Sequence, residues 1–460
     1  MPIIRSISGI RATLNDGLRP DILTKYVAAY CNTLSDGAIV IGRDGRPSGK
    51  WIVDLVSATI SSCGREVIQL GICPTPTVQL LTEKSDAVGG ISITASHNPE
   101  MWNGLKFLNS EGVFLDQKEN NKFWNLYDND NLNYSVDPNN SSEVKNINSV
   151  ESHIKSIIHS RYFKVDEIKK YFKQKKYTVV VDAVNASGSN FVPRLLAELG
   201  CSVIELFTDN TGIFPHTPEP ITENLKQLSD SVKENKADIG IAVDPDADRL
   251  VIINENGEPI GEEKTIAIAV MSVLCSLDIF GNDYNKVVVV NQSTSGMIEK
   301  IADEFEIEVV RSAVGEINVV NKMKETKALI GGEGSGGVIL PHIHYGRDSL
   351  VGIALLLSLL SRTKQSIGEL SNSLPKVYTQ KGKVELNSNP SLILEKLKNK
   401  FSEQNISIID GLRIVLDENS WVHIRASNTE PIVRIITESN TEARAIELFE
   451  EYKAVLNNYL

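Results

Sequence analysis

The chain has 460 residues, of which 41% are hydrophobic and 23% charged, which is enough to bury the cores of about three soluble globular domains. Its 47 Lys and Arg residues are outnumbered by 59 Asp and Glu, and the net charge of −12 argues against a nucleic-acid or anionic-membrane partner. Five scattered cysteines without a CxxC pair, no signal pattern and no apolar run of membrane-spanning length predict a cytoplasmic protein without a disulfide framework.

Three parts of the chain repeat one pattern of predicted elements. Each has a continuous β-branched strand, a Ser-Gly pair, an amphipathic helical pattern and a second strand. The first strands lie at residues 38–42, 178–182 and 286–290. Continuous apolar strands that alternate with helices are typical of parallel sheets covered on both faces. We therefore predict three repeated α/β domains.

Composition predicts where these domains join. Residues 129–148 are rich in Asn, Asp and Ser, which indicates a linker, and a helical pattern at 265–277 begins the third unit. An apolar helix at 350–360 closes that unit. From about residue 377, shorter strands and helical stretches at 391–401 and 441–456 indicate a small α+β domain. The predicted domains are 1–145, 146–253, 254–373 and 374–460.

Residues 91–99, Ile-Ser-Ile-Thr-Ala-Ser-His-Asn-Pro, are the first stretch that suggests chemistry. An apolar run ends there in small residues, and the Asn-Pro pair prevents continuation into a helix. Ser96 is therefore predicted on a turn at a strand end, with His97 beside it and Lys106 further along. Cationic and amide donors around a serine suit a phosphoryl group. The alternative is a plain turn with a capping serine.

The second stretch places Asp244, Asp246 and Asp248 directly after an apolar run, with Arg249 next. Carboxylates at alternate positions can converge on one hard cation, and oxygen ligands suit Mg²⁺. Without such a cation, neighbouring carboxylates repel one another. A calcium loop would need Gly where Arg249 stands, and helical flanks where these flanks resemble strands. A solvated acidic turn is the remaining alternative.

Two further loops are less specific by themselves. Residues 331–337 offer Glu333 and Ser335 to sugar hydroxyls, and their glycines let a ligand approach the backbone. Residues 425–431 combine a cation with short polar side chains that suit a phosphate dianion. These side chains are Arg425, Ser427, Asn428 and Thr429. An ordinary glycine turn and an ordinary polar hairpin are the respective alternatives.

Together the four loops resemble the motifs of the α-D-phosphohexomutase superfamily, in the family's order. The resemblance implies an α/β protein of four domains around a central cleft, three of them repeats and the fourth a smaller α+β domain. It implies phosphorylation of Ser96, and a Mg²⁺ site formed by Ser96 and the three aspartates. Glu333 and Ser335 would contact sugar hydroxyls, and the loop that begins at Arg425 would bind the phosphate that is not transferred. The catalytic residues that it implies are Ser96, His97, Lys106, Arg11 and Arg249.

The activity implied by this resemblance is the interconversion of hexose 1-phosphates and 6-phosphates. Phosphorylated Ser96 gives its phosphoryl group to the sugar, the resulting bisphosphate turns over in the cleft, and the other phosphate returns to Ser96. Mg²⁺ and Lys106 would neutralise charge on the transferred group. The resemblance further implies a hexose 1,6-bisphosphate activator, a sugar-phosphate substrate, and a monomer or homodimer.

The chain departs from the family pattern at two places. Many relatives have His where this chain has Gly337, and His342 or His344 could substitute for it. Residues 8–12 lack the Gly that usually follows the Arg. The sugar loop is similar to that of archaeal-type phosphoglucosamine mutases, which predicts glucosamine phosphate as substrate, with mannose and glucose phosphates as the alternative. A phosphoserine-type phosphohydrolase and a non-catalytic sugar-phosphate sensor are the alternatives from other functional classes.

Overall fold

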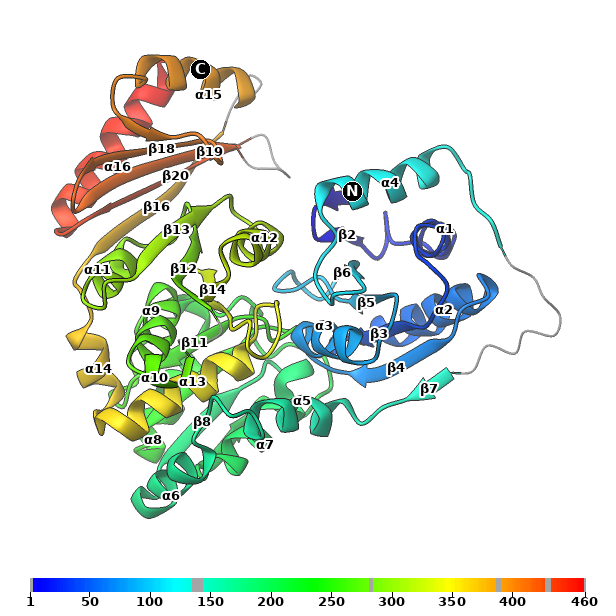
Figure 1. The fold of residues 1–460 in the computed structure, drawn as a ribbon, viewed down its shortest axis with the longest axis horizontal. Coiled ribbons are helices and arrows are strands. Elements are labelled where there is room, and N and C mark those ends of the chain that lie inside the picture. Colours follow the sequence, from blue (N-terminus) through cyan, green and yellow to red (C-terminus); the bar gives the residue numbers. More distant parts are fainter. Residues whose placement is uncertain (1–2, 135–143, 281–283, 386–389, 427–431, 459–460) are drawn as a thin grey trace.

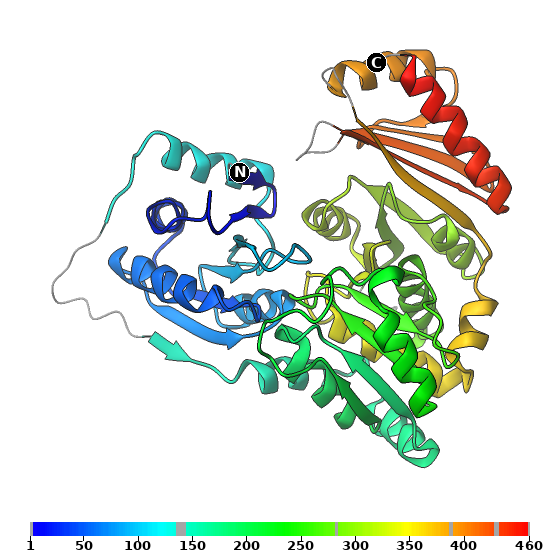
Figure 2. The same ribbon diagram turned by 180° about the vertical axis from the view of Figure 1, so that it is seen from behind.

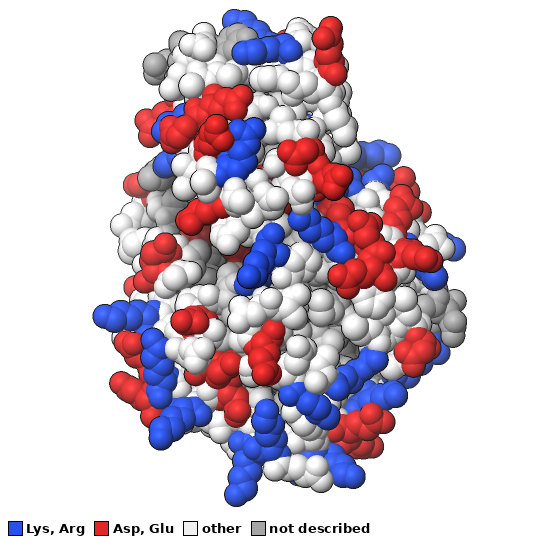
Figure 3. Space-filling view, turned by 90° about the vertical axis from the view of Figure 1, so that its left-hand side faces the viewer, with Lys and Arg blue, Asp and Glu red and all other residues white. Residues whose placement is uncertain are grey.

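The computed structural model describes residues 3–134, 144–280, 284–385, 390–426 and 432–458. Four sheets follow one another in chain order, and the fourth lies against the third (Figure 1). The view from behind shows the same succession (Figure 2). On the face shown in Figure 3, acidic and basic side chains are interspersed. The predicted class, three α/β repeats and a smaller α+β unit, is confirmed.

The first sheet has seven strands in the order β1-β2-β6-β5-β3-β4-β7. Its strands are β1 (Ile4–Ser6), β2 (Gly9–Thr13), β3 (Ile39–Arg43), β4 (Val67–Ile72), β5 (Gly89–Ile93), β6 (Trp102–Asn109) and β7 (Val144–Asn146). Its helices are α1 (Pro20–Cys31), α2 (Gly49–Ser62), α3 (Thr75–Lys84) and α4 (Gln117–Asp128). β7 pairs in parallel with β4, so the predicted linker at 129–148 is wrong for residues 144–146. A linker composition does not prevent a short edge strand, because backbone groups alone form the pairing.

The second and third sheets have four strands each, in the orders β11-β10-β8-β9 and β13-β12-β14-β15. The second unit contains α5 (Ser149–Ile158), α6 (Val165–Lys175), β8 (Thr178–Asp182), α7 (Val192–Glu198), β9 (Ser202–Leu206), α8 (Lys226–Asn235), β10 (Ile239–Val243) and β11 (Leu250–Ile253). Two short 3₁₀ turns, Ser187–Asn190 and Thr222–Asn224, accompany them. The third unit contains α9 (Glu262–Leu274), α10 (Leu277–Phe280), β12 (Asn285–Asn291), α11 (Met297–Asp303), β13 (Glu308–Ser312), α12 (Glu316–Thr326), β14 (Ala328–Glu333), β15 (Gly337–Ile339), α13 (Ser349–Thr363) and α14 (Ile367–Ser373).

One arrangement of four strands recurs in the three repeats. It reads β6-β5-β3-β4 in the first sheet, β11-β10-β8-β9 in the second and β15-β14-β12-β13 in the third. In each, one strand pairs in parallel on one side and antiparallel with the next strand of the chain on the other. The three connections between these antiparallel pairs are residues 94–101, 244–249 and 334–336. Three of the predicted chemical loops therefore occupy equivalent places in the three domains.

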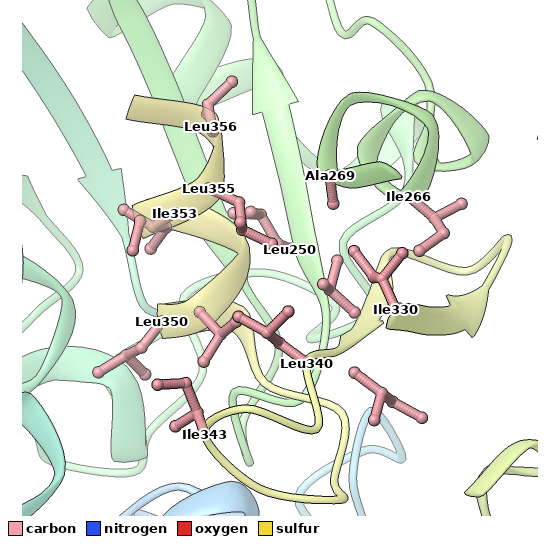
Figure 4. Close-up of a cluster of buried hydrophobic side chains, with 14 of the residues drawn as sticks. Leu250, Ile266, Ala269, Ile330, Leu340, Ile343, Leu350, Ile353, Leu355 and Leu356 are labelled. Carbon is pink, nitrogen blue, oxygen red and sulfur yellow. The ribbon is translucent and has the colours of Figure 1, made fainter. Parts of the chain in front are cut away.

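Side chains on both faces of the strands explain the continuous apolar runs. In β3, Val40 packs into one buried cluster while Ile39 and Ile41 pack into another on the opposite face. In β8, Val180 likewise faces a different cluster from Val179. One cluster continues through the first three domains, and Figure 4 shows its part around Leu250 between α9 and α13. This shared core joins the three repeats into one packed body.

The fourth sheet is antiparallel, in the order β16-β20-β19-β18-β17, and has a core of its own. Its elements are β16 (Tyr378–Glu385), α15 (Pro390–Lys400), β17 (Asn405–Ser407), β18 (Leu412–Asp417), β19 (Ser420–Ala426), β20 (Ile432–Ser439) and α16 (Glu442–Asn457). Among the described residues no single helix is long and apolar enough to cross a membrane; α13 and α14 pass that test only as a pair bent by 91°.

Candidate functional site

The Ser96 loop is held from behind by a buried ion pair. Ser96 has φ 51°, in the left-handed region that side chains disfavour, and its N–H donates to Thr94 Oγ1 at 2.8 Å. Arg46, whose side chain is fully buried, pairs with Asp44 and donates to the carbonyl oxygens of Ser96 and Asn98. Thr94 Oγ1 in turn donates to Asp44 at 2.6 Å. This network fixes the strained backbone that turns the Ser96 hydroxyl toward the second domain.

The Ser96 hydroxyl meets the aspartate cluster. Its Oγ donates to Asp244 Oδ2 at 3.1 Å, although 148 positions separate the two residues. Asp244, Asp246 and Asp248 are buried, and one ligand oxygen from each lies within 4.8 Å of the others. Within the described part of the chain, the Oδ1 atoms of Asp246 and Asp248 accept no hydrogen bond. Buried carboxylate oxygens without donors fit an oxygen-binding cation such as Mg²⁺.

Lys106 supplies part of the positive charge that this cluster needs. Its Nζ donates to Asp246 Oδ2 at 2.6 Å and lies 3.5 Å from Asp248 Oδ2. Burial alone would lower the pKa of Lys106, but the two aspartates outweigh it and raise that pKa. Burial would likewise raise the pKa of Asp246, which Lys106 holds well below its usual value. Burial and the neighbouring carboxylates raise the pKa of Asp244 instead. A further cation would therefore stabilise the charged form of the cluster.

A cavity of about 670 Å³ opens in front of these residues and is lined by all four domains. The predicted residues that line it are Arg11, Ser96, His97, Lys106, Arg249, Glu333, Ser335 and Arg425. His97 Nδ1 lies 3.4 Å from Ser96 Oγ. Burial and the cations Arg249 and Arg11 lower the pKa of His97 to about 2, so its ring is neutral. The cavity thus brings the predicted residues of separate domains to one place.

Glu333 ends β14 and is held by several donors. Its Oε1 accepts from Asn291 Nδ2 at 2.8 Å and from Gly315 N at 3.0 Å, and its Oε2 accepts from Arg347 Nη1 at 2.6 Å. Burial alone would raise the pKa of Glu333, but Arg347 and these hydrogen bonds lower it below its usual value. Glu333 is therefore a fixed carboxylate at the cavity wall, where it can accept hydrogen bonds from hydroxyl groups.

The fourth domain contributes cations. Arg425, the penultimate residue of β19, has its Nη1 3.4 Å from Asp410 Oδ2. The predicted Ser427, Asn428 and Thr429 lie outside the described residues. Arg434 is paired directly with Arg425 on β19 and with Lys383 on β16. Like charges directly opposite in a sheet repel one another. Arg425 and Arg434, the two members of this row that line the cavity, suit an anion such as phosphate.

Sequence reasoning missed several residues that line the cavity. They are Glu219, Glu262, Glu263, Asn291, Ser293, Glu316, Arg347, Lys381 and Arg434. No motif marks them, because they come from ordinary helix starts, strand positions and connecting loops. The proposed substitutes His342 and His344 are wrong: neither is among the described residues that line the cavity. His342 packs against Tyr162 and Tyr284, and His344 is buried beside Asp348.

A second group of possible metal ligands lies away from the cavity. Nε2 of His153 and Nε2 of His344 lie 2.9 and 3.0 Å from Asp348 Oδ2, and Asp348 Oδ1 accepts from the first backbone amides of α13. His153 Nδ1 also lies 2.8 Å from Thr77 Oγ1 in the first domain. Because these groups hydrogen bond one another, they form a buried connection between three domains.

Comparisons with known proteins agree with this geometry. Four family models, described as the alpha/beta/alpha domains I, II and III and the C-terminal domain of phosphoglucomutase/phosphomannomutase, match residues 3–133, 151–257, 264–378 and 381–455. A phosphoglucomutase/phosphomannomutase of Thermococcus kodakarensis is 34% identical, over 96% of each chain. A phosphoglucosamine/phosphogalactosamine mutase of Sulfurisphaera tokodaii is 31% identical, over 97% of this chain and 98% of its own. A crystal structure of a family protein from Burkholderia thailandensis superposes with a TM-score of 0.83 at 25% identity, covering 99% of this chain and 98% of that one.

Proposed function

The chain belongs to the phosphoglucomutase/phosphomannomutase family, and we propose that it is a phosphoglucosamine mutase, which interconverts glucosamine 6-phosphate and glucosamine 1-phosphate. Membership makes it a phosphohexomutase, an isomerase that moves a phosphoryl group. The choice of sugar is supported by relatives named for this activity, such as a probable phosphoglucosamine mutase of Pyrococcus horikoshii, 32% identical over 98% of this chain and 97% of its own. Mannose and glucose phosphates are the alternative substrates, since the relative from Thermococcus kodakarensis is named a phosphoglucomutase/phosphomannomutase.

One observation carries the catalytic assignment: Ser96 Oγ lies 3.1 Å from Asp244 Oδ2 at the wall of the shared cavity. In this proposal, phosphorylated Ser96 gives its phosphoryl group to a sugar hydroxyl, and the second phosphate of the resulting bisphosphate returns to Ser96. Mg²⁺ held by Asp244, Asp246 and Asp248 would neutralise charge on the transferred group. Lys106, Arg11 and Arg249 add positive charge there, so catalysis is chiefly electrostatic.

In this proposal the third and the fourth domain each supply one group of residues that binds the sugar phosphate. Glu333 and Ser335 accept and donate hydrogen bonds to the sugar hydroxyls, and Arg425 with Ser427, Asn428 and Thr429 binds the phosphate that is not being transferred. Neutral His97 lies close enough to Ser96 to form a hydrogen bond with its hydroxyl oxygen. A separate phosphate site on the fourth domain would bind either phosphate of the bisphosphate, one before the intermediate turns and the other afterwards.

Several finer assignments belong to the same proposal. The domains are taken as 1–145, 146–253, 254–373 and 374–460, near the limits of the four family matches. A hexose 1,6-bisphosphate would phosphorylate Ser96, because the proposed cycle starts from phosphoserine. A cytoplasmic location, and a monomeric or homodimeric state, stay predictions.

The deciding experiment supplies the purified protein with Mg²⁺ and a trace of hexose 1,6-bisphosphate. Phosphorus NMR then follows glucosamine, mannose, glucose and N-acetylglucosamine phosphates in separate samples. Fastest interconversion of the glucosamine phosphates supports the proposal, and faster turnover of another sugar would replace the substrate named here. Release of free phosphate alone would indicate the hydrolase, and no change with any sugar contradicts the mutase. Ser96→Ala should bind sugar phosphate without turnover, whereas a sensor would have no turnover to lose.

A further inference from the structure

Gly337, the first residue of β15, lies against the side chain of Arg347. A Cβ atom at position 337 would lie 2.4 Å from Cδ of Arg347, closer than real Cβ contacts, and 3.1 Å from its Cγ, which is tighter than most of them. The backbone of Gly337 is not among those with positive φ, so its conformation does not require glycine. The absence of a side chain at 337 therefore leaves the space that the stem of Arg347 fills.

The guanidinium of Arg347 holds three carboxylates that come from three elements. It donates from Nη2 to Asp248 Oδ2 at 2.5 Å, from Nη1 to Glu333 Oε2 at 2.6 Å, and from Nε to Glu316 Oε2 at 3.1 Å. Asp248 belongs to the loop after β10, Glu333 ends β14, and Glu316 begins α12. The side chain of Arg347 is 12% exposed, so water screens these pairs weakly.

The backbone beside Arg347 is itself fixed. Asp348 caps α13 by accepting from Leu350 N at 2.8 Å, and its N–H donates to Val338 O at 2.8 Å. Arg347 therefore projects from a rigid helix start toward two loops that belong to different sheets. A planar guanidinium with donors in a fixed fork sets both distance and angle between the groups it binds.

We propose that Arg347 is a positioning residue that sets the spacing between the aspartate loop and the Glu333 loop, and that glycine at 337 is required for it to do so. This inference rests on the proposed function in one respect: the first loop places the reacting phosphoryl group and the second places the sugar. A fixed spacing between them places the hydroxyl in line with the phosphoryl group. Arg347 also forms an ion pair with Asp248, and it therefore competes with a metal cation for that carboxylate.

The test combines two readouts on Gly337→Ala, Arg347→Ala and the double variant. Arg347→Ala should lower kcat about 10- to 100-fold, as the loss of a group that orients a metal ligand does. Gly337→Ala should lower it about tenfold by displacing Arg347, yet change it less than about twofold when Arg347 is already Ala, since neighbours that act together are not additive. If the two losses multiply in the double variant, the coupling is refuted.

Calorimetric titration with Mg²⁺ alone gives the readout that a purely structural role would not move. Arg347→Gln removes the positive charge that pairs with Asp248. This variant should therefore bind Mg²⁺ about threefold or more tightly, while its kcat falls. Weaker binding together with lower kcat would show general damage and overturn the proposal. Arg347→Lys, which keeps the charge and loses the fork, should leave Mg²⁺ affinity near that of the natural protein and still lower kcat.

Arg362→Ala is the matched control, because Arg362 lies exposed near the end of α13 and contacts Ser276 and the Cys275 carbonyl. It should change neither readout. If the natural protein turns over no sugar phosphate, the proposed function fails, while the Mg²⁺ titrations of the same variants still decide whether Arg347 competes at Asp248.

Discussion

Arg46→Met should destabilise the protein and misplace Ser96 at the same time. The side chain of Arg46 is fully buried, pairs with Asp44, and donates to two carbonyl oxygens of the Ser96 loop. Methionine fills a similar volume with no donor, so the variant removes these bonds with little change in packing. Asp44 would then be a buried carboxylate without its cation.

The magnitude follows from these contacts. Removal of one partner from a buried ion pair costs about 3–5 kcal/mol. A carbonyl that loses a charged donor adds about 1–3 kcal/mol, but one guanidinium serves all these groups, so the costs do not add. Thr94 and the N–H of residue 46 still donate to Asp44. We therefore expect a loss of about 3–5 kcal/mol of unfolding free energy and, from the displaced Ser96, about 100-fold in kcat.

The assay is the first unfolding transition in urea, followed by circular dichroism, together with turnover measured by phosphorus NMR. Arg46→Met/Asp44→Asn should recover part of the stability, because it leaves no unpaired charge behind. Arg362→Met, at an exposed position, serves as the control. A loss below about 1 kcal/mol in Arg46→Met, the usual effect of an average substitution, would refute the reasoning. A double variant less stable than Arg46→Met would do the same.

Three further predictions concern ionisable groups. Burial raises the pKa of Glu316 from 4.5 to about 7. The stability that protonated Glu316 contributes to the fold is therefore full below pH 4.5 and is lost as the pH rises through 7. Above that pH, the unfolding free energy of Glu316→Gln in urea should exceed that of the natural protein by up to about 3 kcal/mol. The neutral ring of His97 should show no titration between about pH 5 and 9 by NMR, and the pH profile of kcat/KM should keep its inflections in His97→Asn. Burial would raise the pKa of Asp348, but His153 and His344 lower it, so Asp348→Asn should cost about 2–4 kcal/mol at pH 7, a difference that shrinks as pH falls below 3.8 in thermal unfolding.

The sequence predicted the strands and loops of the repeats because local patterns record burial. Continuous β-branched runs indicated strands buried on both faces, and residues 178–182 form a strand with those bounds. Charged or glycine-rich stretches after such runs indicated chemistry, since a buried strand end seldom carries three carboxylates without a cation. The edge strand β7 escaped prediction because its three residues are exposed and have no apolar pattern.

The predicted site residues lie together for a reason that no local pattern contains. Lys106 reaches Asp246 across 140 positions, and Arg11 reaches Asn98 across 87. The first contact depends on the strand order shared by the repeats, which places each loop at an equivalent edge of its sheet, and the second depends on β2, which adds to the first sheet beside β6. The family resemblance anticipated that result, whereas composition and spacing alone left the four loops unconnected.

The amino-acid sequence by itself determined the fold class, the order of the repeats and which side chains are proposed to bind a metal, a sugar and a phosphate. Only the tertiary structure decided that His344 is buried against Asp348, and that Arg347 fills the space beside Gly337 and holds three carboxylates. The physical reason is that periodicity reports which face of an element is buried. It does not report which side chain from a distant element fills the space that a small residue leaves.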